Sequence, residues 1–393
     1  MLTSQITFAQ FCAWVQRKGS LALCLALCML GLGRSGRAQE HRVTEFDAPN
    51  AGTGQYQGTA PSSVNIFGAI TGSVTDNSYG THGFVCTSDG HFTEFDAPGA
   101  DPVVGGTYPE LINDLGVVLG YDIDTNGVSH GFLRTADGRF TTIDAPGANT
   151  GASPGTFARS FNLEGVVVGG YYDANNFTRG FRRAPDGSFT TFVAPGECTT
   201  NLGTGCHGTG AWNINIFGVI VGPYEDNSGN FVEHTFIRFP DGTFTTFAVP
   251  GSSMEAGQGT GPASSSGLND AGAITGNYYD ANNVFHGYLR YPNGSFIKFE
   301  APGADTTDAY YGTFPESLNN FGAIAGYYLD SNGVYHGFLR NPDGAFATFE
   351  APGADTNAGD YNGTFPISIS SSGAITGYYV DASNVFHGFL RRP

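Results

Sequence analysis

Residues 269–303, NDAGAITGNYYDANNVFHGYLRYPNGSFIKFEAPG, decide how the rest of the chain is interpreted. Two runs rich in β-branched and aromatic residues, 273–279 and 284–291, flank the segment Asp280-Ala281-Asn282-Asn283, and a third run follows Pro292-Asn293-Gly294. Asn and Gly favour tight turns between such runs because they tolerate positive φ. The stretch therefore predicts three strands joined by two tight turns.

The same pattern recurs along the chain with a period near 50 residues. The copies align on an Ala-Pro or Val-Pro pair that ends at Pro49, Pro98, Pro146, Pro195, Pro250, Pro302 and Pro352. Each copy also contains a short run that ends in Asn or Ser, so each holds four strands in an antiparallel order. A period near 50 is typical of propeller blades. We therefore predict an all-β fold, a seven-bladed β-propeller of four-stranded antiparallel blades.

The two ends of the repeat region complement each other. Residues 42–47 match the last strand of a copy, and residues 384–390 match a third strand that has no fourth strand after it. We expect these strands to pair and to close the ring, which would remove exposed sheet edges. Residues 39–393 then form a single propeller, with blades at about 50–98, 99–146, 147–195, 196–250, 251–302, 303–352, and 353–393 plus 42–49.

A second recurring glycine lies inside the second strand of every copy, as Gly276 does in the opening stretch. Glycine within a strand indicates a bulge or the close approach of a neighbouring backbone.

The first 38 residues have the features of a signal peptide. Arg17 and Lys18 precede an apolar run at 21–33. A short segment that contains small residues then ends at Ala38, and we expect cleavage after this residue. An N-terminal membrane anchor is the alternative, but the run is too short to span a bilayer comfortably. Lipidation at Cys24 or Cys28 is a second alternative, although a leucine precedes each cysteine. We expect a protein that is secreted, periplasmic or extracellular, and not embedded in a membrane.

The charge balance excludes some partners. The chain has 17 basic and 35 acidic residues, and removal of residues 1–38 would remove four basic residues and no acidic one. So acidic a surface repels nucleic acid and anionic lipid. We expect no nucleic-acid partner and a monomeric chain.

Three cysteines follow the signal region. Cys198 and Cys206 flank a seven-residue loop in the longest repeat, and export favours a disulfide between them. Cys86 remains, and we expect it to be a small buried residue on a strand.

A histidine recurs on the third strand of the copies: His82, His130, His234, His286, His336 and His387, with Arg179 in the remaining copy. Third strands of adjacent blades lie on the order of 10 Å apart, given a strand spacing of ~4.8 Å, whereas metal ligands lie ~2 Å from the ion. We therefore expect each histidine to form hydrogen bonds within its own blade, and we predict no cofactor.

One turn leaves calcium as a secondary candidate. Asp122, Asp124 and Asn126 lie in DIDTNG, which resembles the start of an EF-hand loop. Leu133 stands at the twelfth position, where a bidentate glutamate is needed. Hairpin turns are the alternative explanation of these acidic residues.

The most variable position of the repeat lies on the innermost strand, three residues before the recurring Asn or Ser. The residues there are Ser62, Glu110, Arg159, Trp212, Ser266, Glu316 and Ile367. Packing would favour similar residues in each copy, so we expect this set to line the mouth of an axial channel and to bind a ligand. The alternative is that these residues vary because they have no function. We find no catalytic motif, although Glu110 and Glu316 could act as paired carboxylates.

The repeat unit G-T-F-P-x-S-x-N-x-x-G-A-I-x-G-Y-Y-x-D-x-x-x-V-x-H-G-F-L-R-x-P-D-G-x-F-x-T-F-E-A-P-G-A resembles the HAF-type probable extracellular repeats of bacteria, over essentially all of residues 42–393. The resemblance implies export and a β-repeat array, without an agreed activity. Where that family often has an aromatic residue, this chain has Arg134, Arg290, Arg340 and Arg391.

The leading hypothesis is a secreted, non-catalytic binding module for a polysaccharide or an extracellular protein. One alternative is a glycan hydrolase or lyase that uses Glu110 and Glu316. Another is a structural protein of the cell envelope.

Overall fold

The computed structural model describes residues 42–103, 105–151, 155–198, 208–255, 257–264, 266–358 and 362–393. The predicted signal peptide and Cys206 lie outside these residues. Every regular secondary-structure element among the described residues is a β-strand, which confirms the prediction of an all-β fold. In the same residues, no helix has the length and apolar character needed to cross a membrane.

The strands follow one another in antiparallel meanders. The first four consist of β2 (Gly58–Val64), β3 (Ile70–Thr75), β4 (Thr81–Cys86) and β5 (Phe92–Phe95); β6 (Gly106–Ile112), β7 (Val118–Ile123), β8 (Ser129–Arg134) and β9 (Phe140–Ile143); β10 (Thr156–Phe161), β11 (Val167–Tyr172), β12 (Thr178–Arg183) and β13 (Phe189–Phe192); β14 (Asn213–Ile214), β15 (Ile220–Glu225), β16 (Glu233–Arg238) and β17 (Phe244–Phe247).

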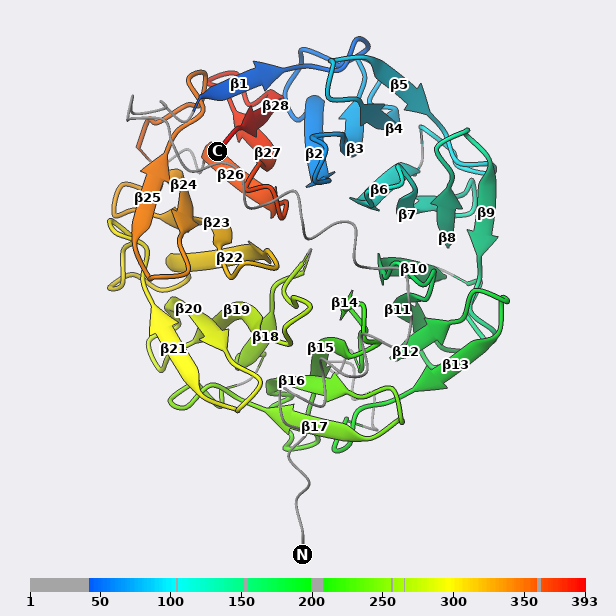
Figure 1. The fold of residues 1–393 in the computed structure, drawn as a ribbon, viewed down its shortest axis with the longest axis vertical. Coiled ribbons are helices and arrows are strands. Elements are labelled where there is room, and N and C mark those ends of the chain that lie inside the picture. The colour runs from blue at the N-terminus through cyan, green and yellow to red at the C-terminus, as the bar shows by residue number, and fades with distance from the viewer. Residues whose placement is uncertain are drawn as a thin grey trace, which may run out of the picture. The chain divides into compact units, whose positions relative to one another are not determined.

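The later strands continue the pattern: β18 (Thr260–Pro262), β19 (Ile274–Tyr279), β20 (Phe285–Arg290) and β21 (Phe296–Phe299); β22 (Gly312–Leu318), β23 (Ile324–Leu329), β24 (Tyr335–Arg340) and β25 (Phe346–Phe349); β26 (Gly363–Ile369), β27 (Ile375–Val380) and β28 (Phe386–Arg391). The first strand of each meander lies nearest to a common centre (Figure 1). The shortest first strands, β14 and β18, occur in the two longest repeats.

The last meander takes its fourth strand from the other end of the chain. β1 (Val43–Phe46) pairs antiparallel with β28, with Val43 opposite Arg391 and Phe46 opposite Gly388. Figure 1 shows β1 and β28 side by side. The sequence predicted this pairing from the incomplete copies at the two ends.

The meanders join one another to different degrees. Within the described residues, β6–β9, β10–β13 and β14–β17 form separate four-stranded antiparallel sheets. The other strands form one mixed sheet, because short parallel bridges link neighbouring meanders. Gly58 bridges Phe386, Gly312 bridges Phe285, and Gly363 bridges Tyr335.

The recurring glycine of the second strand allows close backbone contact. A Cβ atom on Gly326 would lie well inside van der Waals contact with the carbonyl oxygen of Phe314, and one on Gly276 would collide with the carbonyl oxygen of Gly261. The innermost strand therefore packs directly on this glycine, as its position in the sequence predicted.

The recurring asparagine joins one meander to the next. The Oδ1 atom of Asn269 accepts a hydrogen bond from the N–H of Ala273 (2.9 Å), which closes its own turn. Its Nδ2 atom donates to the carbonyl of Asn319 (3.3 Å), in the next meander. Asn65, Asn162, Asn215 and Asn319 make the corresponding contacts. A buried side chain thus satisfies backbone groups in two adjacent repeats.

Aromatic and cationic side chains link the outer strands. The guanidinium of Arg290 lies 4.7 Å from the ring centre of Phe247, and that of Arg340 lies 5.0 Å from the ring centre of Phe299. In each case the ring belongs to the preceding meander, so the pair is an inter-repeat cation–π contact. Cys86 stands at the position of these arginines and is buried with Phe46 and Phe92, as a free thiol.

Candidate functional site

The recurring histidines bind carboxylates of their own meander. His336 Nδ1 lies 2.5 Å from Glu350, and its Nε2 lies 3.4 Å from Asp330 in the β23–β24 turn. His82 and His130 have corresponding partners at 2.8 Å. Tyr328 stacks on His336 with ring centres 5.0 Å apart. The histidines therefore fix the turns of the scaffold, as we predicted.

The copy that lacks this histidine makes equivalent contacts with acidic residues. Arg179 replaces the histidine, and Asp173 binds its Nε atom at 2.8 Å. The acidic residue that normally follows the fourth strand is Val193 here. Glu197 takes over this role and forms a short contact with Arg179. The longer arginine side chain thus reaches an acidic residue farther along the chain.

The calcium candidates are occupied by local contacts. The Asp124 Oδ1 atom accepts hydrogen bonds from the N–H groups of Asn126 and Val128, each at 2.8 Å. Its Oδ2 atom accepts from Asn126 Nδ2 at 3.1 Å. Asp122 is buried on β7 opposite His130, and burial raises its pKa to about 6. Among the described residues, no group of three or more acidic, His or Cys residues could hold a metal ion.

The predicted disulfide is described at one end only. Cys198 is buried in a small cluster with Phe177 and Phe231. Cys206 lies outside the described residues, so the pairing stays a prediction.

The variable residues of the innermost strands occupy β-bulges. The antiparallel register shifts by one residue between Pro61 and Ser63, and the corresponding shifts place Glu110, Arg159, Glu316 and Ile367 at the extra position. A bulge re-aims one side chain without disturbing its neighbours. This geometry explains why the position tolerates unrelated residues. The bulge lies opposite the recurring glycine of the second strand, as in the pairing of Pro61 with Gly72, where the sequence predicted a bulge or a close backbone contact.

Two of the predicted residues form an ion pair between adjacent meanders. Arg159 Nη1 lies 2.7 Å from Glu110 Oε1. Burial raises the pKa of Glu110 above its ordinary value, and the Arg159 charge opposes that rise. The Arg159 guanidinium also lies 5.7 Å from the ring centre of Tyr121 and 5.8 Å from that of Phe157.

Glu316 and Ser62 have other partners. Ser264 donates a hydrogen bond to Glu316 at 3.4 Å, and burial raises the pKa of Glu316 to about 7. Ser62 donates to the carbonyl of Pro109 at 2.7 Å. Glu110 and Glu316 thus each have a partner in an adjacent repeat.

Most members of the candidate set do not line the cavity among the innermost strands. A cavity of about 230 Å³ lies among the innermost strands, lined by residues that include Ser63, Asn113, Ser160 and Ser368. Of the predicted set, only Ser266 lines this cavity. The cavity is lined instead by the residues that directly follow the bulged positions: Ser63, Leu111, Ser160 and Ser368.

Arg159 and Trp212 instead meet in a pocket between two meanders. The Trp212 pocket, as we call it, has a volume of about 320 Å³. Its lining comes from the β10–β13 meander and from residues 208–233: Phe157, Arg159, Gly170, Tyr172, Thr178, Gly208, Gly210, Trp212, Pro223, Tyr224, Glu225 and Glu233. Aromatic walls with a few charged groups are typical of sites for small polar ligands.

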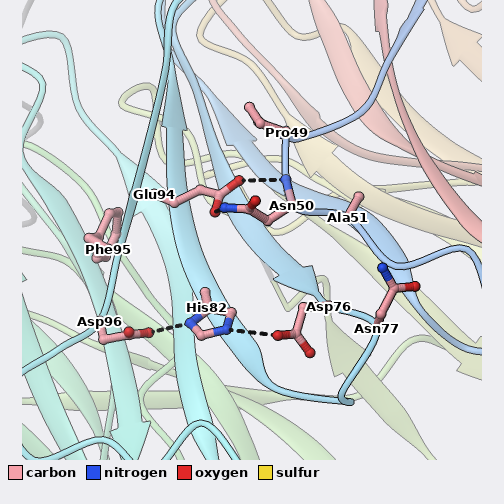
Figure 2. Close-up of a pocket in the computed structure, with 9 residues that line it drawn as sticks. All are labelled: Pro49, Asn50, Ala51, Asp76, Asn77, His82, Glu94, Phe95 and Asp96. Atoms are coloured by element: carbon pink, nitrogen blue, oxygen red, sulfur yellow. Dashed lines mark hydrogen bonds and ion pairs between the residues drawn. The ribbon is translucent and has the colours of Figure 1, made fainter.

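A second pocket lies beside the first recurring histidine (Figure 2). It has a volume of about 490 Å³ and is lined by Asp76, His82, Glu94 and Asp96, among others. Figure 2 shows His82 between Asp76 and Asp96, and Glu94 facing Asn50. These polar groups already bind one another, and the same His–carboxylate contacts recur in other meanders. We therefore assign this pocket to the scaffold.

Comparison with solved structures identifies the architecture. A lectin from Burkholderia pseudomallei, BP39L, aligns with a TM-score of 0.52 at 10% identity, over 86% of this chain and 97% of that chain. AofleA from Arthrobotrys oligospora aligns with a TM-score of 0.39 at 11% identity, over 89% and 86% of the two chains. The likeness to BP39L shows that the chain has a β-propeller fold.

Two further comparisons gave no match. No family model matches the chain, so the resemblance to HAF-type repeats stays a prediction. No curated protein matches it either.

Proposed function

We propose that the protein is a non-catalytic carbohydrate-binding module with a binding site in the Trp212 pocket. The observation that supports this proposal most strongly is the joint presence of Trp212, Phe157 and Tyr172 around one pocket with Arg159. Aromatic faces bury the apolar C–H face of a sugar ring. The guanidinium donates hydrogen bonds in a fixed geometry, which suits hydroxyl and ring oxygens.

The architecture supports the same proposal. BP39L is named a lectin, and its fold is similar to that of this chain. We further propose that the propeller has seven blades and is closed by β1, that the protein is exported, and that it belongs with the HAF-type repeats. The antiparallel pairing of β1 with β28 supports closure, and the bond from Val64 N–H to Ser368 Oγ (3.3 Å) joins the last meander to the first.

A glycan microarray tests the function. Purified wild-type protein should bind a restricted set of glycans, and Trp212→Ala should lose at least about tenfold in affinity because the stacking surface is removed. Glu316→Gln is the matched control, since Glu316 lies outside the pocket lining, and it should bind like the wild type. If no glycan binds, or if Trp212→Ala binds as well as the wild type, the proposed site is wrong.

The same experiment addresses a catalytic alternative. Hydrolysis or lysis of glycans through Glu110 and Glu316 predicts turnover of the bound glycan that is lost in Glu316→Gln. The proposal of a binding module predicts that the bound glycans remain intact.

A further inference from the structure

The Trp212 pocket occupies a place that aromatic side chains fill in other copies of the repeat. The residue directly after the recurring glycine of the second strand is Tyr121 in β7, Tyr327 in β23 and Tyr378 in β27. Each tyrosine stacks on an aromatic residue of its own first strand: on Tyr108 at 5.1 Å, on Phe314 at 5.2 Å, and on Phe365 at 5.0 Å between ring centres.

In the β10–β13 meander one member of this stack is missing. Phe157 stands at the place of Tyr108, but Gly170 stands at the place of Tyr121. Phe157 makes edge contacts with Tyr121 and Tyr172, at 5.2 and 5.8 Å between ring centres. It has no stacked partner across from it on β11, because Gly170 carries no side chain.

A second glycine shapes the opposite wall. A Cβ atom on Gly210 would lie 3.0 Å from Trp212 Nε1, so a glycine there lets the indole lie close to the backbone. In the β6–β9, β10–β13, β22–β25 and β26–β28 meanders, the corresponding position carries an aromatic residue: Tyr108, Phe157, Phe314 and Phe365. The pocket therefore results from two glycines at positions that are aromatic in several sister repeats.

We infer that Gly170 is the residue that determines ligand entry, and that a sugar ring stacks on Phe157 in place of the missing tyrosine ring. This inference rests on the proposed function and names the subsite within it. A pyranose has a flat apolar face of similar extent to the phenol ring, and its hydroxyls would lie beside Arg159 and the Trp212 indole. In three other copies, a tyrosine ring takes up this space: Tyr121, Tyr327 and Tyr378.

Restoring the missing ring tests the inference. A Cβ atom on Gly170 would lie 3.0 Å from Thr178 Cγ2, and Ser129 stands at the place of Thr178 beside Tyr121. The double variant Gly170→Tyr/Thr178→Ser therefore reproduces a pair that the protein already accommodates. Ser73→Tyr places the same side chain at the corresponding position of β3 and serves as the matched control.

The readout uses Trp212 emission from a chain of residues 39–393, because Trp212 is the single tryptophan in that sequence. Acrylamide quenching needs no ligand, and it should fall in the double variant because the tyrosine ring fills the pocket. Titration with the glycan selected on the array should show at least a tenfold loss of affinity for the double variant and no change for Ser73→Tyr. Circular dichroism and the melting temperature establish that each variant is folded.

The outcomes separate the inference from the function. Unchanged quenching, or wild-type affinity in a folded double variant, overturns the role of Gly170 while glycan binding stands. Absence of glycan binding by the wild type overturns the proposed function itself, and with it the subsite. If the double variant does not fold, Phe157→Leu decides: it keeps an apolar residue but removes the stacking face, and wild-type affinity in this variant overturns the subsite.

Discussion

His387 and Asp47 are 340 positions apart in the sequence, yet His387 Nδ1 lies 3.0 Å from the Asp47 carboxylate. The same contact joins His82 to Asp96 across 14 positions within one continuous meander. The two ends of the chain thus reproduce, side chain for side chain, the geometry of an uninterrupted repeat. The N-terminal strand is therefore a structural part of the last meander.

Deletion of residues 39–49 should destabilise the protein strongly. It removes β1, its pairing with β28 and the partner of His387, and it exposes the edge of β28 to intermolecular pairing. We expect the melting temperature to fall by on the order of 10 °C, with a tendency to aggregate. Differential scanning calorimetry and light scattering measure both effects. An unchanged melting temperature would show that β1 contributes nothing to the fold.

Stability should depend on pH through His286. Its hydrogen bond to Glu300 raises its pKa above the usual 6.5, and Asp280 adds to the rise. A raised pKa in the folded state stabilises the protein fully below about pH 6.5, and this contribution is lost as the pH rises through the folded pKa. His286→Gln should therefore lower the melting temperature more at pH 6 than at pH 9. Equal losses at the two pH values would contradict this assignment.

Asn269→Ala should cost roughly 1–3 kcal/mol, because it leaves the N–H of Ala273 without a buried partner and removes one of the two hydrogen bonds to the carbonyl of Asn319. Asn320→Ala is the control, since Asn320 binds Asp270 on the exposed surface. Urea unfolding of both variants measures the difference. If both lose the same stability, the asparagine contacts do not hold the meanders together.

Gly326→Ala should be far more damaging than its size suggests. The added methyl group would collide with the carbonyl oxygen of Phe314 and force β22 away from β23. We expect a loss of more than about 3 kcal/mol or a failure to fold. Thermal unfolding of the purified variant, or its recovery in the soluble fraction, reports the effect. A stability close to that of the wild type would show that the strands can separate at little cost.

The local pattern of the sequence predicted much of this structure. Turn residues such as Asn282 and Asn283 and the period near 50 residues indicated the meanders, and the spacing of the histidines indicated a role in the scaffold. These features depend on neighbours within one repeat. The unpaired strand at each end was sufficient to predict that β1 pairs with β28.

The site required contacts between repeats, which a single repeat does not encode. The Glu110–Arg159 ion pair joins residues 49 positions apart, and the bulges that orient both side chains depend on how two strands pair. The pocket depends on a ring that is missing at Gly170. The signal was present as a glycine at a position that carries tyrosine in three other copies, but its meaning follows only from the stacking of those tyrosines in the structure.

The most direct test of the central claim is the indole N–H signal of Trp212 in protein labelled with 15N-tryptophan, assigned by its absence in Trp212→Phe. With the glycan selected on the array, this signal should shift and saturate at the affinity measured by fluorescence. A glycan that binds with that affinity and leaves the Trp212 signal unmoved would contradict the assignment of the site.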